Sequence, residues 1–165
     1  MLEITLASIL MMVTTLILLS VFSYLDLRYR RVSNRVILAG ALIGSAVAVL
    51  SGHMLLYARL HLLAPFMVVP IAYALWRAGS LGGADAKSLI VVALLSPGLE
   101  FAQWDIPFIE VTLGDWLRIL LMLLFGLLYQ RANAQPQSAV NPEKPIPLIP
   151  FLLLSYLLSQ LLALL

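Results

Sequence analysis

The sequence has 165 residues, of which 62% are hydrophobic and only 11% are charged. An average soluble domain carries about 25% charged residues, so this composition excludes a soluble globular protein. The formal net charge of +2 is too small to indicate nucleic-acid binding, and a sequence without Cys excludes disulfides and thiolate metal sites. We therefore expect an all-α, multi-pass membrane protein whose solvent is the lipid bilayer.

Apolar stretches recur along the whole chain, at about the 20 residues with which a helix crosses a hydrocarbon core about 30 Å thick. The first stretch carries an acid at Glu3 and is longer than the core of a signal peptide, so we expect a retained span. The fourth stretch is short. Six spans are predicted, at about Ile4 to Leu25, Arg35 to Ser51, His61 to Arg77, Ala86 to Ser96, Leu113 to Gln130 and Ile146 to Leu165.

Charged residues are distributed unevenly between the two predicted membrane faces. If the first span ends in the cytoplasm, that face receives eight of the ten basic residues, whereas five of the eight acids fall on the opposite face. The positive-inside rule predicts this asymmetry, so both termini are expected on the extracytoplasmic side. The basic residues assigned to the cytoplasmic face are Arg28, Arg30, Arg31, Arg35, Arg77, Lys87, Arg131 and Lys144.

The segment from residue 131 to residue 145 is rich in Pro, Gln, Asn and Ala and is too polar to lie in lipid. We expect it to be a cytoplasmic linker between the fifth and sixth spans. The sequence shows no internal repeat and no heptad pattern. It therefore predicts a single membrane-embedded domain over residues 1–165.

Asp26 and Asp85 lie at the ends of predicted spans on the same membrane face. Asp26 ends the first span and Asp85 opens the fourth, so the two can meet in space although they are far apart in sequence. An Asp at the centre of a membrane helix costs roughly 2.5 to 3.5 kcal/mol on insertion scales, and such residues usually mark function. Each also has a structural interpretation: Asp26 could pair with a neighbouring Arg, and Asp85 could cap a helix or pair with Lys87.

Two neighbouring carboxylates suit peptide hydrolysis by acid–base catalysis, with no metal and no cofactor. Like charges placed close together cannot both ionise easily, so such a pair shares one proton. The ionised carboxylate can then activate water while the protonated one polarises the scissile carbonyl group. Gly82 and Gly83, just before Asp85, would let an extended substrate approach the main chain, although they could also serve only a tight turn.

Two motifs resemble those of the type IV prepilin peptidases, especially short, single-function members such as archaeal preflagellin peptidases. The segment from Asp26 to Asn34, DLRYRRVSN, is similar to the family's first motif, an Asp followed by basic residues and an Ile-Pro-Asn-like triplet. The segment from Gly82 to Lys87, GGADAK, is similar to the second, G-x-G-D followed closely by Lys. Ser33 stands where the first motif usually has Pro, and Ala84 stands where the second has its second Gly.

The resemblance implies an intramembrane aspartyl endopeptidase in which Asp26 and Asp85 form the catalytic pair. Its substrates and partners would be type IV prepilins or preflagellin-like proteins, cut at the cytoplasmic face of a prokaryotic cell membrane to remove a basic leader. Long bacterial relatives carry paired cysteines and also methylate the product; this chain has no Cys, which implies peptidase activity alone. The residues expected to support the substrate loop are Gly82, Gly83, Ala84, Lys87 and Asn34.

Some of these residues have other interpretations, and so does the whole chain. Lys87 could instead extend to the lipid headgroups, and Asn34 could cap the second span. His53 and His61 are predicted to be interfacial residues at the opposite face.

Other functions of the whole protein stay open: a presenilin-like or signal-peptide-peptidase-like protease of other membrane helices, or a proton- or ion-coupled transport protein. A transport site is expected near the bilayer midplane, whereas both Asp residues are predicted at one edge.

Overall fold

The computed structural model describes residues 5–99, 106–132 and 146–163, and all regular structure in these ranges is helical. Three helices, α1, α4 and most of α6, are long and apolar enough to cross a membrane. The prediction of an all-helical fold is thereby confirmed, and the three apolar helices are consistent with a membrane protein. The helices are α1 (Leu6–Tyr29), α2 (Asn34–Leu50), α3 (His53–Leu56), α4 (Ala58–Arg77), α5 (Gly83–Leu95), α6 (Pro107–Ala132) and α7 (Ile149–Leu162).

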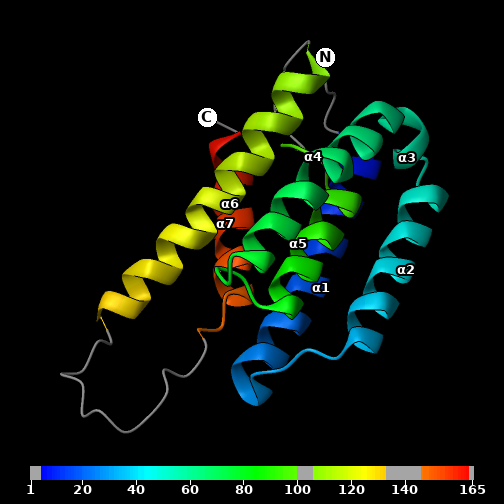
Figure 1. Ribbon diagram of the computed structural model, residues 1–165. Helices are drawn as coiled ribbons and strands as arrows, with labels where there is room; N and C mark the ends of the chain where they lie inside the picture. The colour runs from blue at the N-terminus through cyan, green and yellow to red at the C-terminus, as the bar shows by residue number, and fades with distance from the viewer. Residues whose placement is uncertain (1–4, 100–105, 133–145, 164–165) are drawn as a thin grey trace, which may run out of the picture.

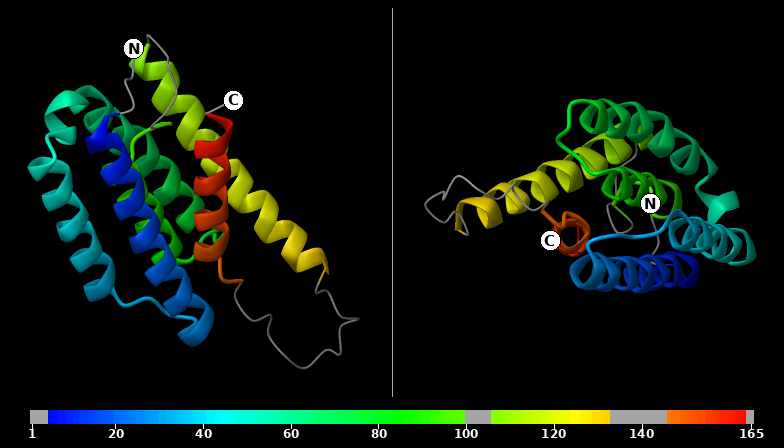
Figure 2. Two further views of the ribbon diagram at one scale, coloured as in Figure 1. Left: turned by 180° about the vertical axis from the view of Figure 1, so that it is seen from behind. Right: turned by 60° about the horizontal axis from the view of Figure 1, so that its bottom comes forward.

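The six longer helices run alternately up and down the bundle (Figure 1). Helices α1, α4 and α6 run toward one end, and α2, α5 and α7 return from it (Figure 2). One end of the bundle therefore holds the last turns of α1, α4 and α6 and the first turns of α2, α5 and α7. We call it the carboxylate end, because Asp26 and Asp85 lie there.

Helix α5 is the most enclosed helix of the bundle. It packs against α4 on one side and against α1 and α2 on the other (Figure 2), and it also contacts α7. Its 13 residues span about 20 Å at a rise of about 1.5 Å per residue, which is less than a hydrocarbon core. Because other helices cover α5, its length does not have to match the bilayer, which explains the short fourth span.

Several helix boundaries differ from the predicted spans. Helix α1 continues past Asp26 to Tyr29 and ends where Arg30 takes a left-handed conformation, with φ of 53°, and donates its N–H to Asp26 O at 2.8 Å. Helix α7 begins at Ile149 rather than Ile146, with Pro150 in its first turn, where proline is tolerated. Hydropathy marks where lipid is crossed, whereas backbone hydrogen bonding decides where a helix ends.

Further differences concern α3 to α6: α4 begins at Ala58 rather than His61, and α5 begins at Gly83 rather than Ala86. Helix α3, a single turn between α2 and α4, is not predicted by the sequence pattern. Helix α6 extends beyond the predicted fifth span in both directions and includes residues 131 and 132 of the predicted linker. Residues 133–145 of that linker lie outside the described residues, as do residues 1–4 and 164–165 at the two ends of the chain.

Two glycines allow α2 to approach its neighbours closely. A Cβ on Gly40 would lie 2.7 Å from Phe22 Cζ of α1, and a Cβ on Gly44 would overlap Leu95 Cδ1 of α5. Small residues at such positions let membrane helices pack backbone against backbone. The spacing of four residues places both glycines on one face of α2, and this face packs against α1 and against the end of α5.

The opposite end of the bundle contains a buried polar network centred on Arg118 of α6. This guanidinium donates to the main-chain oxygens of Ser96, at 2.7 Å, and of Gly98, and to Asp115 Oδ1 at 3.1 Å. It also donates to Ser159 Oγ of α7 at 3.3 Å. Arg118 is only 1% exposed, so it ties the end of α5 to α6 and α7 within the core.

His53 and His61 are also buried in this region, which corrects the expectation that they are interfacial. Their rings are hydrogen-bonded, with His53 Nδ1 at 2.9 Å from His61 Nε2. His61 Nδ1 lies 2.8 Å from Leu94 O, at the end of α5. The pair therefore stabilises the junction of α3, α4 and α5, and its polar atoms are satisfied within the protein.

Candidate active site

Asp26 lies one turn before the end of α1, on the side of the helix that faces the bundle. It is 7% exposed. Its carboxylate interacts with the main-chain N–H of Ile149, at the start of α7, and with the positive charge of Arg30. Among the described residues, no group donates a hydrogen bond to the buried Oδ2 atom. This oxygen is therefore available to accept a proton or to bind a further group.

Asp85 lies in the first turn of α5 and is 8% exposed. Its Oδ2 atom accepts a hydrogen bond from the Gly82 N–H at 3.1 Å, so the carboxylate caps its own helix. The carboxylate also interacts with the main-chain N–H groups of Leu148 and Ile149 and with the negative charge of Asp26. The capping role expected as the structural interpretation of Asp85 is thus present, and it fixes the carboxylate beside Gly82.

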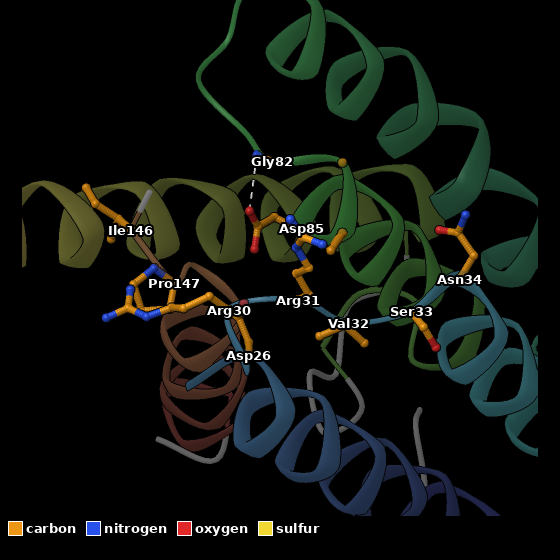
Figure 3. A pocket seen from close by; sticks show the side chains of 12 residues that line it. Asp26, Arg30, Arg31, Val32, Ser33, Asn34, Gly82, Asp85, Ile146 and Pro147 are labelled. Atoms are coloured by element: carbon orange, nitrogen blue, oxygen red, sulfur yellow. Dashed lines mark hydrogen bonds between the residues drawn. The ribbon is translucent and has the colours of Figure 1, made fainter. Parts of the chain in front are cut away.

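A single cavity of about 510 Å³ brings the two carboxylates together (Figure 3). Its walls come from three separate parts of the chain: the end of α1 with the loop to α2, the start of α5, and the approach to α7. The first two walls are the two sequence motifs. The cavity is lined by Asp26, Arg30, Arg31, Val32, Ser33, Asn34, Gly82, Gly83, Ala84, Asp85, Ile146 and Pro147.

Of the predicted supporting residues, Gly82, Gly83, Ala84 and Asn34 line this cavity and Lys87 does not. Ser33 rather than Asn34 caps α2, because Ser33 Oγ accepts the Val36 N–H at 3.4 Å. Asn34 Oδ1 instead accepts a hydrogen bond from Lys87 Nζ at 2.7 Å. Apart from the two carboxylates, the other lining residues are Arg30, Arg31, Val32 and Ser33, which lie within the first motif, and Ile146 and Pro147, which precede α7. The first four could therefore have been selected from the motif itself.

The two glycines of the second motif differ in their surroundings. A Cβ on Gly82 would lie 2.5 Å from Asp85 Oδ2, closer than real Cβ contacts come. A Cβ on Gly83 would have its nearest neighbour, Trp76 Nε1, at 3.8 Å, which is an ordinary contact. A side chain at Gly82 would therefore displace the Asp85 carboxylate from its position beside the main chain, whereas the position of Gly83 has room for a side chain.

The described residues contain no group of three or more His, Asp or Glu side chains arranged to hold a metal ion. The polar groups that face the cavity are two carboxylates, two guanidinium-bearing side chains, one hydroxyl and one amide. Such a set can bind a polar main chain and exchange protons with it. The cavity thus combines hydrogen-bonding capacity with paired acids.

The fold and the cavity together define a helical membrane protein with a buried pair of carboxylates at one end of its bundle. A family model described as the type IV leader peptidase family matches residues 12–164, and the chain belongs to this family. This confirms the resemblance and indicates a peptidase of the type IV leader peptidase kind. No curated protein and no solved structure matches the chain.

Proposed function

We propose that this protein is an aspartyl endopeptidase that removes the basic leader from prepilin-like or preflagellin-like substrates, with Asp26 and Asp85 as its catalytic pair. One observation carries the proposal. Two buried carboxylates, one from each family-like motif, line one cavity although 59 positions separate them in the sequence. Membership of the type IV leader peptidase family supports the substrate class.

Hydrolysis would proceed with the two carboxylates sharing one proton. The ionised member takes a proton from water while the water oxygen forms a bond to the scissile carbonyl carbon. The protonated member gives its proton to the carbonyl oxygen. When the tetrahedral gem-diol collapses, the C–N bond breaks and the leaving nitrogen takes a proton from the carboxyl group that received one from water, while the other carboxylate takes back a proton from a gem-diol hydroxyl as the C=O bond re-forms. The pair then again holds one proton.

The surroundings of the pair suit a substrate in extended form. A helical substrate hides its amides in its own hydrogen bonds, so cleavage needs an unwound segment whose backbone groups find other partners. Gly82 and Gly83 are exposed in the cavity wall and present main chain without side chains. Pairing of the substrate backbone with this segment would place the scissile carbonyl group beside Asp85.

The distribution of basic residues supports the cytoplasmic membrane face as the place where the substrate is cleaved. Arg28, Arg30 and Arg31 lie at the carboxylate end, which the positive-inside rule assigns to the cytoplasm. We therefore propose that cleavage occurs at the cytoplasmic face of a prokaryotic cell membrane, that both termini lie outside, and that residues 1–165 act as one peptidase domain. By the resemblance, whose methylating relatives carry paired cysteines, we propose peptidase activity without methylation for residues 1–165, which contain no Cys.

The test is co-expression of the protein with candidate prepilins and preflagellins, followed by the size of the substrate and the N-terminal sequence of the product. We expect the wild type to remove the leader and both Asp26→Asn and Asp85→Asn to leave it in place. Glu143→Gln is the matched control, since Glu143 is the third acid assigned to the cytoplasmic face. Each variant must be present in the membrane fraction at the wild-type level.

The same experiment separates this proposal from the rival functions. Cleavage of other membrane helices with no cleavage of prepilins would favour a presenilin-like specificity. Cleavage of neither substrate class, with wild-type protein present in the membrane, would contradict the proposed activity and favour transport. Cleavage that persists in one Asp variant would remove that carboxylate from the catalytic pair.

A further inference from the structure

One side-chain hydrogen bond joins the two segments that carry the carboxylates. Lys87 Nζ of α5 donates to Asn34 Oδ1 of α2 at 2.7 Å, although the two residues are 53 positions apart. Lys87 comes two residues after Asp85, and Asn34 comes eight residues after Asp26. The bond therefore connects the end of the first motif to the end of the second, across the wall of the cavity.

The direction of Lys87 separates it from the reacting groups. Residues two apart on a helix do not face each other, so the Lys87 and Asp85 side chains leave α5 in different directions. Asp85 lines the cavity and Lys87 does not. The ammonium group contacts Asn34 instead, and Asn34 is the first residue of α2 and lines the cavity itself. Lys87 thus acts on the site through Asn34.

The loop between α1 and α2 has two anchors on the bundle. Val32 is 7% exposed and packs in the core cluster that also contains Phe22, Ile37 and Leu95. Asn34 is the polar anchor, and its bond to a charged donor is of the stronger kind. With both anchors in place, the loop that follows Asp26 is held at a fixed distance from the first turn of α5.

We infer that Lys87 and Asn34 form a clasp that sets the separation of the Asp26 segment from Asp85, and that Lys87 is a positioning residue for peptide cleavage. The inference rests on the proposed function. Misplacement of a reacting group by about 1 Å can lower a rate by about a hundredfold. Loss of the clasp should therefore act on kcat rather than on substrate binding. Both side chains are exposed, so their replacement leaves the hydrophobic core intact.

The experiment compares kcat and KM for leader cleavage in Lys87→Met, Asn34→Ala and the double variant. We expect each single variant to lower kcat by about ten- to a hundredfold with KM nearly unchanged, since a small misplacement of a reacting group can lower the rate of the chemical step by up to about a hundredfold. The double variant should be no slower than the slower single variant, because both replacements remove the same bond. Lys87→Arg should retain most of the activity, since a guanidinium can still donate to Asn34.

Arg35→Met is the matched control, because Arg35 is a basic residue next to Asn34 that lies outside the cavity lining. It should cleave at the wild-type rate. Wild-type kcat in Lys87→Met, effects of the two single variants that multiply in the double variant, or a change confined to KM would each overturn the clasp. A fall in kcat for Arg35→Met as large as for Lys87→Met would also overturn it.

A second measurement keeps the clasp testable if the proposed function fails. Spin labels on cysteines at positions 35 and 83 report the distance between the starts of α2 and α5, in a chain with no other Cys. We expect a narrow distance distribution that broadens or shifts in Lys87→Met. An unchanged distribution would contradict the clasp, whereas absence of cleavage by the wild type would contradict only the proposed function.

Discussion

At the scale of single residues, the Asp85 carboxylate has two tasks. One of its oxygens caps α5 by accepting the Gly82 N–H, and the same group lines the cavity with Asp26. The cap restricts the rotamer of Asp85, so the helix N-terminus itself orients the proposed catalytic group. The absence of a Cβ at position 82 lets the Asp85 carboxylate lie close to the main chain in the rotamer that the structure shows.

The contrast between Gly82 and Gly83 gives a prediction. Gly82→Ala places a methyl group 2.5 Å from Asp85 Oδ2 and must displace the carboxylate, so leader cleavage should fall by about a hundredfold. Gly83→Ala meets its nearest neighbour at 3.8 Å and should have a much smaller effect. Cleavage rates of the two purified variants check this. Equal losses in both would show that the two glycines serve only the turn.

The position of the two carboxylates is predictable from the sequence, whereas the contacts of their supporting residues are not. The alternation of spans predicts Asp26 and Asp85 at one membrane face, and both lie at the same end of the bundle and line one cavity. The bond between Lys87 and Asn34 could not be predicted, because it joins residues 53 positions apart and depends on the packing of α2 against α5. Whether the supporting residues act on a substrate stays a prediction.

At the scale of helices, the enclosed position of α5 explains both its short length and the polar network at its far end. The carbonyl groups at the end of a helix lack partners within the helix. The main-chain oxygens of Ser96 and Gly98, just after α5, accept hydrogen bonds from Arg118 of α6. A buried arginine can satisfy these groups because its guanidinium has five donors in one plane.

This network leads to a stability prediction. Arg118→Leu leaves Asp115 and the end of α5 without their charged partner, and breaking such a buried pair costs about 3 to 5 kcal/mol. The thermal unfolding temperature in detergent should fall accordingly. Arg59→Leu is the matched control, since Arg59 is exposed, and it should unfold near the wild-type temperature. Unchanged unfolding of Arg118→Leu would mean that the network does not stabilise the bundle.

The sequence did not reveal this role of Arg118. A single arginine near a predicted span end is compatible with an interfacial charge, and its partners are main-chain oxygens that no sequence pattern marks. The sequence pattern also does not mark where helices end, since α1 extends to Tyr29. In contrast, the order of the apolar segments follows directly from hydropathy, and each segment overlaps one helix of the structure.

At the scale of the whole molecule, the orientation in the membrane is a prediction that single cysteines can test. Ser80 is exposed in the loop between α4 and α5 at the carboxylate end, and Leu55 is exposed in α3 at the opposite end. The chain has no other Cys to interfere. We expect a membrane-impermeant thiol reagent to label Leu55→Cys in intact cells, and Ser80→Cys only after the membrane is opened. The reverse pattern would contradict the orientation.

We propose that Asp26 and Asp85 act as one catalytic unit. The most direct measurement is the rate of leader cleavage by purified wild type, Asp26→Asn, Asp85→Asn and the double variant. We predict that each single variant loses about 10² to 10⁴ in rate and that the double variant loses little more, since residues that act together are not additive. Cleavage within tenfold of the wild-type rate in either single variant, or losses that multiply in the double variant, would contradict the account.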